Sequence, residues 1–225
     1  MSLRSKFFAL TYDRQIAKAE QAGLHAMRER LLAGASGDVI EIGAGTGLNL
    51  TCYGPEVRSL TMTEPEPPML RRLERRVHEQ HPSATVLRAP AEDLPFNDDA
   101  FDTVISTLVL CTVDDQLRAL RELRRVLRPG GRLLFVEHIR SDDEKLARLQ
   151  DRMLPINIRI GHGCHCNRPT LDGIRNAGFN VTELGHDTLK HVPPFIRPLI
   201  VGVAELSTST PLTSIDGAVY TSATS

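Results

Sequence analysis

The chain has 225 residues, 41% of them hydrophobic and 24% charged, which is enough apolar material for the core of one domain and excludes extensive disorder. Its 27 basic and 28 acidic side chains give a formal net charge of -1, which argues against a protein held on nucleic acid by a basic face. No apolar run approaches the roughly 18 residues of a membrane span, and residues 1–12 contain no signal-peptide core, so we expect a cytoplasmic protein.

Strand-like and helix-like segments alternate through the first two thirds of the chain. We expect a helical segment at 1–35. Five stretches are typical of buried strands: 38–42, 57–63, 85–88, 101–110 and 132–138. Apolar residues recur at helical spacing from Met69 to Val77 and again from Leu117 to Leu127. This alternation predicts an α/β sheet with helices on both faces.

The pattern is weaker after residue 138. Ser141 and Glu144 form a capping-box pattern, which predicts a helix through about Leu154. A loop rich in Gly, His and Cys then precedes a short helix at 171–177. The last two strands are predicted at 179–184 and 198–206. We therefore expect a single domain over 1–206, with a substrate-side insert at about 141–168, followed by a polar tail at 207–225.

The most informative motif is a glycine-rich turn directly after the first strand. Gly43, Gly45 and Gly47 follow Ile42, and glycines there leave the backbone accessible to a ligand. A helix beginning near Leu48 would aim its free amide groups at that ligand. The spacing is GxGxG, because Leu48 stands where the dinucleotide fingerprint has its last glycine. Binding of NAD is therefore disfavoured.

Carboxylates stand at the carboxyl ends of three strands of the predicted sheet. Glu41 precedes the glycine turn, Glu64 follows the second strand, and Glu92 with Ala91 follows the third. The carboxyl ends of parallel strands meet at one edge of a sheet, where Glu64 can accept both hydroxyls of a ribose and Glu92 can face an adenine. The sequence therefore predicts a nucleoside site at this edge.

At these positions the chain resembles the class I S-adenosylmethionine-dependent methyltransferases with a type 11 methyltransferase domain. The resemblance covers roughly residues 35–206 and is carried by five stretches: 39–50, 63–65, 91–96, 101–106 and 127–132. It implies a three-layer Rossmann-like fold, with a seven-stranded, mostly parallel sheet whose last strand is antiparallel. It also implies S-adenosyl-L-methionine as cofactor and S-adenosyl-L-homocysteine as product.

The resemblance further implies how the cofactor is held. Glu41 would lie near the methionine amino group and the glycine turn against the methionyl and ribose portions. Many relatives have Asp in the position of Pro90, so we expect adenine recognition to rest on Glu92. The candidate cofactor-binding residues are Glu41, Gly43, Ala44, Gly45, Gly47, Glu64, Pro65, Ala91, Glu92, Thr107 and Leu108.

A narrower likeness lies in 106–113, 136–139 and Gly163-Cys164 followed by Arg168. These stretches are similar to a group that contains microsomal thiol S-methyltransferases and bacterial small-molecule and phospholipid-amine methyltransferases. They imply a small, fairly apolar acceptor such as a thiol or phenol; the alternatives are an amine head group of the phosphatidylethanolamine type, a quinone, and a non-catalytic cofactor-binding module. The microsomal members carry a hydrophobic N-terminal anchor that residues 1–12 do not resemble, so peripheral membrane contact is left open.

A thiol or phenol acceptor would benefit from a base. His138 is the first candidate, because it ends the fifth strand beside the expected methyl position and imidazole titrates near neutral pH. The alternative is a histidine hydrogen-bonded to backbone. His165, and with it His162, is a rival in the loop that could close over the substrate. Tyr12, Cys164 and Arg168 are assigned to the substrate side, with Arg168 either anchoring that loop or meeting an anionic group.

We expect no metal in this loop. His162, Cys164, His165 and Cys166 would supply four ligands from five consecutive residues, which strains a tetrahedral site. The cysteines at 52 and 111 are interpreted as packing residues. The arginines at 71, 72, 75 and 76 are interpreted as a solvated helix face.

Overall fold

The computed structural model describes residues 3–206, and the polar tail predicted at 207–225 lies outside the described residues. Within that range seven strands form one sheet in the order β3-β2-β1-β4-β5-β7-β6. Neighbouring strands pair in parallel except at β7, which runs antiparallel to both β5 and β6. The predicted mostly parallel sheet with an antiparallel last strand is therefore confirmed. The strands are β1 (Gly37–Ile42), β2 (Val57–Thr63), β3 (Thr85–Leu87), β4 (Phe101–Thr107), β5 (Leu127–His138), β6 (Phe179–Thr188) and β7 (Pro198–Leu206).

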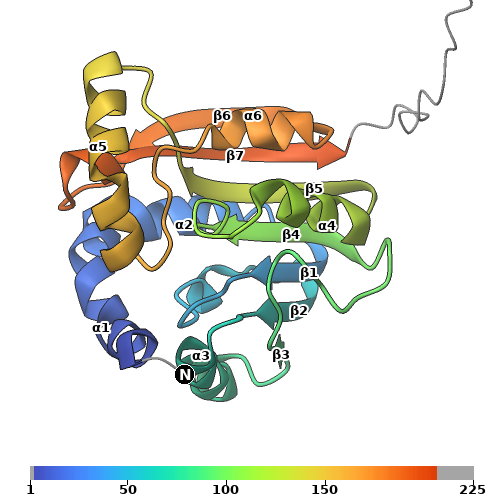
Figure 1. Cartoon of the computed structure of the whole chain (residues 1–225). Coiled ribbons are helices and arrows are strands. Elements are labelled where there is room, and N and C mark those ends of the chain that lie inside the picture. Colours follow the sequence, from blue (N-terminus) through green and yellow to red (C-terminus); the bar gives the residue numbers. More distant parts are fainter. Residues whose placement is uncertain (1–2, 207–225) are drawn as a thin grey trace, which may run out of the picture.

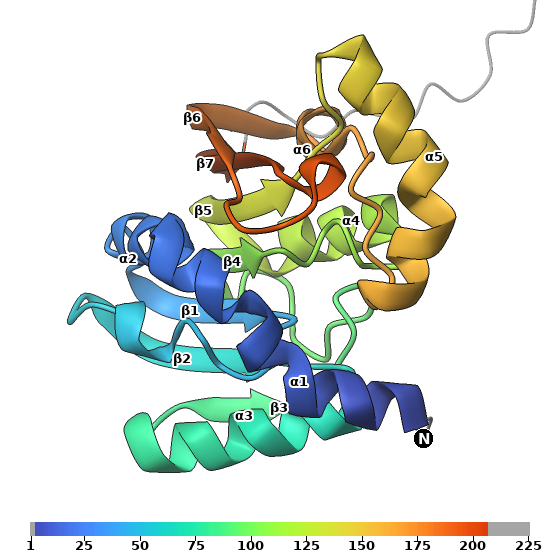
Figure 2. The same ribbon diagram turned by 90° about the vertical axis from the view of Figure 1, so that its left-hand side faces the viewer.

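Helices cover both faces of the sheet. The α-helices of the described chain are α1 (Leu3–Ala19), α2 (His25–Leu32), α3 (Pro67–Gln80), α4 (Gln116–Val126), α5 (Glu144–Ile160) and α6 (Thr170–Asn176), and four of them, α2, α3, α4 and α6, pack on the faces. One apolar layer joins the sheet to α4 and α6, and the other joins it to α2 and α3 (Figures 1 and 2). Successive residues of a strand supply opposite layers, so Ile40 packs toward α4 while Val39 packs toward α2. In the described part of the chain no helix combines the length and apolarity needed to cross a membrane.

Two helices stand beyond the carboxyl ends of the parallel strands, on the side that faces the viewer in Figure 2. α1 runs into α2 through a π-helical turn, Glu20–Leu24, and extends past the strand ends. α5 packs against the 3-10 turn Pro194–Ile196 at the same edge. The carboxyl edge of the sheet is therefore flanked by α1 on one side and α5 on the other.

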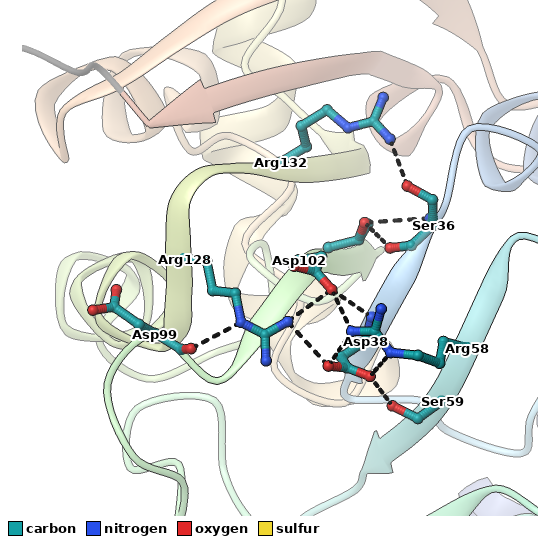
Figure 3. Close-up of polar contacts among 9 residues, drawn as sticks. Ser36, Asp38, Arg58, Ser59, Asp99, Asp102, Arg128 and Arg132 are labelled. Carbon is teal, nitrogen blue, oxygen red and sulfur yellow. Dashed lines mark hydrogen bonds and ion pairs between the residues drawn. The ribbon is translucent and has the colours of Figure 1, made fainter.

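Charge pairs tie the strands together at the opposite, amino edge (Figure 3). Arg128 Nη1 lies 2.7 Å from Asp102 Oδ2 and 3.0 Å from Asp38 Oδ2, and Arg58 contacts the same two carboxylates. Hydrogen bonds from Arg58, Ser59 and Arg128 hold the pKa of Asp38 well below its usual range. This network joins β1, β2, β4 and β5 at the edge that lies away from α1 and α5.

Three local predictions are wrong, one after β1 and two at the ends of α5. The turn after β1 leads into a single 3-10 turn, Leu50–Cys52, and not into a helix from Leu48. The side chain of Asn49 is buried there and forms hydrogen bonds with Arg28 and Glu41. Only a few residues, among them Gly54, then remain before β2 begins. The cap of α5 is Asp143, whose carboxylate accepts from the Leu146 amide at 2.8 Å, and not Ser141. α5 also continues to Ile160, past the predicted end.

Candidate active site

A cavity of about 850 Å³ lies at the carboxyl edge, between the strand ends, α1 and α5. Most residues predicted from the sequence line it: Tyr12, Gly43, Gly45, Glu64, Pro65, Ala91, Glu92, Thr107, Leu108, His138 and Cys164. The others are not among the lining residues: Glu41, Ala44, Gly47, His165 and Arg168. The structure thus brings residues from the carboxyl ends of β1 to β5 to one cavity, together with residues of α1, α3 and α5.

The three glycines after β1 have different surroundings. A Cβ on Gly43 would meet Val109 at 2.7 Å, and one on Gly47 would meet Leu50 at 2.9 Å, so both positions are closed by the protein's own packing. Gly45 has a φ of 61°, and a Cβ there would meet nothing closer than Met69 Cε at 3.7 Å; Gly45 also lines the cavity. Of the three, Gly45 is the one that keeps the backbone open toward a ligand.

Glu64 lies just beyond β2 and faces the cavity, although its side chain is largely buried. Its Oε2 accepts the Gly45 amide and its Oε1 the Glu66 amide, each at 2.8 Å. Burial raises the pKa of Glu64 to about 7, and these two amides oppose the rise. Each carboxylate oxygen keeps a free lone pair, so Glu64 can accept the two hydroxyls of a ribose.

Glu41 supports the glycine turn through hydrogen bonds with residues that follow the turn in the chain. Its Oε1 accepts from Asn49 Nδ2 at 2.9 Å and its Oε2 from the Tyr53 hydroxyl at 2.5 Å. Asn49 in turn accepts from Arg28 Nη1 at 2.8 Å, and all but Tyr53 are buried. Burial raises the pKa of Glu41 to about 7, against the bonds from Tyr53 and Asn49. In this structure Glu41 therefore fixes the turn and its carboxylate is already shared by two donors.

Glu92 joins two loops at the adenine end predicted for the cavity. Its Oε1 accepts from the backbone amide of Asp114 at 2.8 Å, which ties the segment after β3 to the start of α4. Ala91 and Pro90 line the cavity beside it. The Pro65 carbonyl, next to Glu64, accepts from Arg88 Nε at 3.0 Å. These bonds hold the loops after β2 and β3 in place.

The loop after β4 is held by a buried carboxylate that the sequence interpretation did not assign. Glu137 Oε1 accepts from the Ser106 hydroxyl at 2.7 Å and from the amides of Val109 and Leu110 at 2.9 and 3.0 Å. Leu108, inside this loop, has a φ of 61° and lines the cavity. Glu137 therefore stabilises a strained backbone at the centre of the site.

Asp13 joins α1 to the glycine turn and to α3 through Thr46, Arg72 and Arg76, and we call these contacts the Asp13 clamp. This carboxylate accepts from the Thr46 hydroxyl at 2.6 Å, from Arg72 at 2.8 Å and from Arg76 at 2.9 Å. Burial opposes ionisation of Asp13, but these partners lower its pKa overall. The prediction of a purely solvated arginine face is therefore wrong for Arg72 and Arg76. Tyr12, one residue earlier, lines the cavity, and burial raises its pKa to about 12.

Three side chains from distant elements meet on the other side of the cavity, and we call them the Cys–His cluster: Cys111, His138 and Cys164. His138 Nδ1 lies 3.4 Å from Cys111 Sγ and 3.6 Å from Cys164 Sγ, and the two sulfurs are 3.8 Å apart. All three are buried and all line the cavity. Cys111 is thus part of the site, which its interpretation as a packing residue missed.

The cluster shifts the titration of its members. The contact with Cys111, followed by that with His138, lowers the pKa of the Cys164 thiol, and the same sulfur contact raises the pKa of Cys111. Burial lowers the pKa of His138, but the contact with Cys164 leaves it above the ordinary value. His138 Nε2 is buried and has no hydrogen-bond partner within residues 3–206.

The remaining loop candidates have structural contacts. Arg168 Nη1 donates to the Leu110 carbonyl at 2.9 Å, so Arg168 anchors the loop. The His165 amide donates to the Cys111 carbonyl at 2.7 Å, while its Nδ1 is buried without a partner in the described chain. The His162 ring lies 4.6 Å from the Phe8 ring of α1. The role of His165 as a base stays a prediction.

The site residues that sequence reasoning missed share one property: their partners are distant in sequence. Glu137, Asp13 and Asn49 each act on segments that no local spacing connects to them. The signal in the sequence was weak: Glu137 stands directly before the candidate His138, and Asn49 stands two residues after the last glycine of the turn. Buried polar residues next to a motif are therefore the ones to examine first.

A family model described as a methyltransferase domain matches residues 40–135. Thiol S-methyltransferase TMT1B of Homo sapiens is 36% identical over 179 residues, which cover 76% of this chain and 70% of that relative. Thiol S-methyltransferase TMT1A of Homo sapiens is 31% identical over 203 residues, which cover 88% of this chain and 82% of that relative.

Solved structures share the fold. A crystal structure from Thermotoga maritima, described as an S-adenosylmethionine-dependent methyltransferase and possible histamine N-methyltransferase, superposes with a TM-score of 0.69. The match covers 92% of this chain and 100% of that one, at 23% sequence identity. At that identity the similarity concerns the arrangement of the sheet and helices.

Proposed function

Because the chain belongs to the S-adenosylmethionine-dependent methyltransferases, we propose that it transfers the cofactor's methyl group to the sulfur of a small, fairly apolar thiol. The observation that carries this proposal is the lining of the cavity. Apolar side chains line it together with the Cys–His cluster: Phe8, Val109, Ile158, Ile160, Val192 and Ile196. The likeness to two thiol S-methyltransferases supports the same acceptor.

We propose that the cofactor occupies the part of the cavity beside the ends of β1, β2 and β3. Glu64 offers carboxylate oxygens to the ribose hydroxyls, and Gly45 leaves the room that a side chain would fill. We assign Ala91 and Glu92 to the adenine, and Thr107 and Leu108 to the methionyl end, where Glu41 acts through the glycine turn that it fixes. Glu64 follows β2 and His138 ends β5, with β1 and β4 between them in the sheet. This order supports a cofactor beside β1 and β2 and an acceptor next to it, beside β5.

S-adenosylmethionine supplies an electrophilic methyl group on a sulfonium. The protein has to hold the acceptor sulfur in line with that methyl group and keep water away. A thiol reacts as its thiolate, so the acceptor must also lose its proton. We assign this last task to the side of the cavity formed by the Cys–His cluster, and we assign α1 with Tyr12 and the insert at 141–168 to the enclosure of the acceptor.

Other acceptors require different surroundings. A neutral amine is nucleophilic without a base, and a phospholipid head group or a quinone would bring a bulky apolar tail that has to lie along the cavity or outside it. A module that only holds the cofactor would bind it and release no S-adenosylhomocysteine. Each of these alternatives gives a distinct result in the experiments below.

The dependence of turnover on pH tests the residue and the acceptor class together. With an alkyl thiol, we expect His138→Ala to lower kcat at least tenfold, about 1.4 kcal/mol of barrier, without weakening the cofactor. The loss should shrink as pH approaches the acceptor's own pKa, where the thiolate forms unaided. The same profile for His165→Ala tests the second candidate.

An amine acceptor predicts a different outcome, in which alkaline buffer raises wild type and His138→Ala in parallel. If neither histidine variant changes turnover by more than about threefold, under 1 kcal/mol, the cluster has no part in catalysis.

A further inference from the structure

The Cys–His cluster has the dimensions of a metal site. In a tetrahedral zinc site with Zn–S bonds of about 2.3 Å and a Zn–N bond of about 2.0–2.1 Å, two sulfurs lie about 3.8 Å apart and each lies about 3.5 Å from the nitrogen. The corresponding distances here are 3.8 Å between the sulfurs and 3.4 and 3.6 Å from the sulfurs to His138 Nδ1. All three edges of the ligand triangle agree.

Hydrogen bonding alone does not require this closed triangle. Two contacts are enough to link two thiols and one imidazole, whereas here each atom contacts both others. The three ligands come from the loop after β4, the end of β5 and the loop after α5. The predicted strain of a site built from one loop therefore does not apply, since Cys164 is the single ligand taken from that loop.

Buried polar side chains hold the backbone of each ligand. The Cys111 amide donates to Glu137 Oε2 at 3.2 Å, the Cys164 carbonyl accepts from Asn157 Nδ2 at 2.7 Å, and the His138 carbonyl accepts from the Thr170 hydroxyl at 3.0 Å. Glu137, Asn157 and Thr170 are all buried. Metal sites depend on such supporting bonds to keep their ligands in position.

We propose that Cys111, His138 and Cys164 bind a Zn²⁺ ion whose fourth position opens into the cavity and takes the sulfur of the acceptor. Two thiolates and a neutral imidazole give a divalent ion a net charge of zero, which suits a buried site. Three protein ligands with one open position are the pattern of catalytic zinc. The fourth ligand rests on the proposed thiol acceptor, whereas the three protein ligands do not.

The zinc would generate the nucleophile. The acceptor R–SH gives its proton to solvent when its sulfur joins the ion, and the resulting thiolate keeps a lone pair for attack. The new S–CH₃ bond forms as the bond between that methyl group and the sulfonium breaks. The product is a neutral thioether, a weaker ligand than a thiolate, so it leaves the ion. No oxidant or reductant is involved.

Metal content and a spectroscopic probe test the site. The full chain, produced with zinc and freed of any purification tag, should contain one zinc per chain by inductively coupled plasma mass spectrometry. Replacement by Co²⁺ should give the visible bands of tetrahedral cobalt and a thiolate-to-cobalt charge-transfer band. An alkyl thiol should shift these bands, and the alcohol with the same carbon chain should not.

Variants distinguish the cluster from other cysteines. Cys111→Ser, Cys164→Ser and His138→Ala should each lower zinc content at least fivefold. Cys166→Ser is the matched control, because Cys166 is buried in the same small apolar group yet belongs to none of the three contacts, and it should retain the metal. The cobalt spectrum of wild type keeps the test valid if a cluster variant does not fold.

Two results overturn the metal site: a chain that binds neither zinc nor cobalt, or a wild-type chain, prepared without reductant, whose mass shows a Cys111–Cys164 disulfide and no metal. A metal-free chain with full thiol methylation refutes the zinc and leaves the proposed function standing. A third result is a chain that binds zinc, methylates no thiol, and shows no shift of its cobalt bands when a thiol is added to the Co²⁺ form. It refutes the acceptor as fourth ligand and the proposed function, while the three protein ligands stand.

Discussion

Glu64 and Gly45 are in contact and form the centre of the proposed cofactor site. Glu64 accepts the Gly45 amide at 2.8 Å, so the carboxylate proposed to meet the ribose also fixes a glycine of the turn that lines the cavity. Both residues follow from the strand-end rule applied to the sequence. Their bond to each other does not, because it joins the ends of two strands.

Glu64→Gln should weaken S-adenosylmethionine by about 1.5–3 kcal/mol, the range for hydrogen bonds to a charged group. The variant keeps the size of the side chain but exchanges one oxygen that accepts a backbone amide for an NH₂ group, so the loss reports charge, acceptor strength and the support of the turn together. Isothermal titration calorimetry on Glu64→Gln, with Glu66→Gln as the control that also lines the cavity, checks this. A larger loss in the control would move the ribose site to Glu66.

The raised pKa of Glu64, about 7, predicts proton release on binding. The ribose hydroxyls donate to the ionised carboxylate, so binding lowers its pKa and affinity should rise with pH up to about 7 and level off above it. Calorimetry near about pH 6 in buffers of different ionisation enthalpy measures the released protons. Glu64→Gln should release fewer, since the remaining release belongs to other groups such as Glu41; an equal release by both proteins contradicts the assignment.

Gly45→Val should abolish cofactor binding in a folded protein. The branched side chain would project into the cavity, and a positive φ costs a β-branched residue about 1–3 kcal/mol of stability. Gly130→Val is the matched control: Gly130 has a φ of 77° and open space around it, but it lies at the other edge of the sheet. Equal cofactor affinity in the two folded variants would show that Gly45 does not face the ligand.

At the scale of elements, the strands could be predicted from the sequence, whereas the side-chain contacts that join different elements at the site could not. β1, β2, β3 and β5 are apolar runs bounded by glycine, proline or polar residues, so local sequence identifies them. β5 nevertheless begins at Leu127, ahead of the predicted 132, because Leu127 pairs with Phe101 before the Pro-Gly-Gly segment shifts the register. The Cys–His cluster and the Asp13 clamp join elements that sequence spacing does not relate, so they needed the fold.

If the Asp13 clamp holds α1 in place, removing its charge should let the α1 backbone open more often. Asp13→Asn keeps the shape of the side chain but loses the charge that pairs with Arg72 and Arg76. Since these groups are partly exposed, stability should fall by less than about 1 kcal/mol. Hydrogen exchange of the α1 amides should nevertheless become faster, and Glu29→Gln, which breaks an exposed pair in α2, should leave it unchanged. Unchanged exchange in Asp13→Asn would mean that other contacts hold α1.

At the scale of the whole molecule, the two edges of the sheet have separate tasks. The amino edge is tied by the pairs among Asp38, Arg58, Asp102 and Arg128. The carboxyl edge carries the cavity, between α1 and α5. In open α/β sheets ligands bind outside the carboxyl ends of the strands, and this arrangement lets the loops there hold strained residues such as Leu108 without loosening the sheet.

The transfer of an isotope-labelled methyl group tests the central claim most directly. The full chain is incubated with S-adenosylmethionine carrying a trideuterated methyl group, together with an alkyl thiol, the alcohol of the same chain length, a phenol, a primary amine, a quinone or phosphatidylethanolamine vesicles. Mass spectrometry should find the labelled thioether and S-adenosylhomocysteine in equal amounts with the thiol, and no labelled product with the alcohol, the amine, the quinone or the vesicles. Label on the amine, the quinone or the phospholipid, or cofactor binding without any labelled product, would contradict a thiol S-methyltransferase.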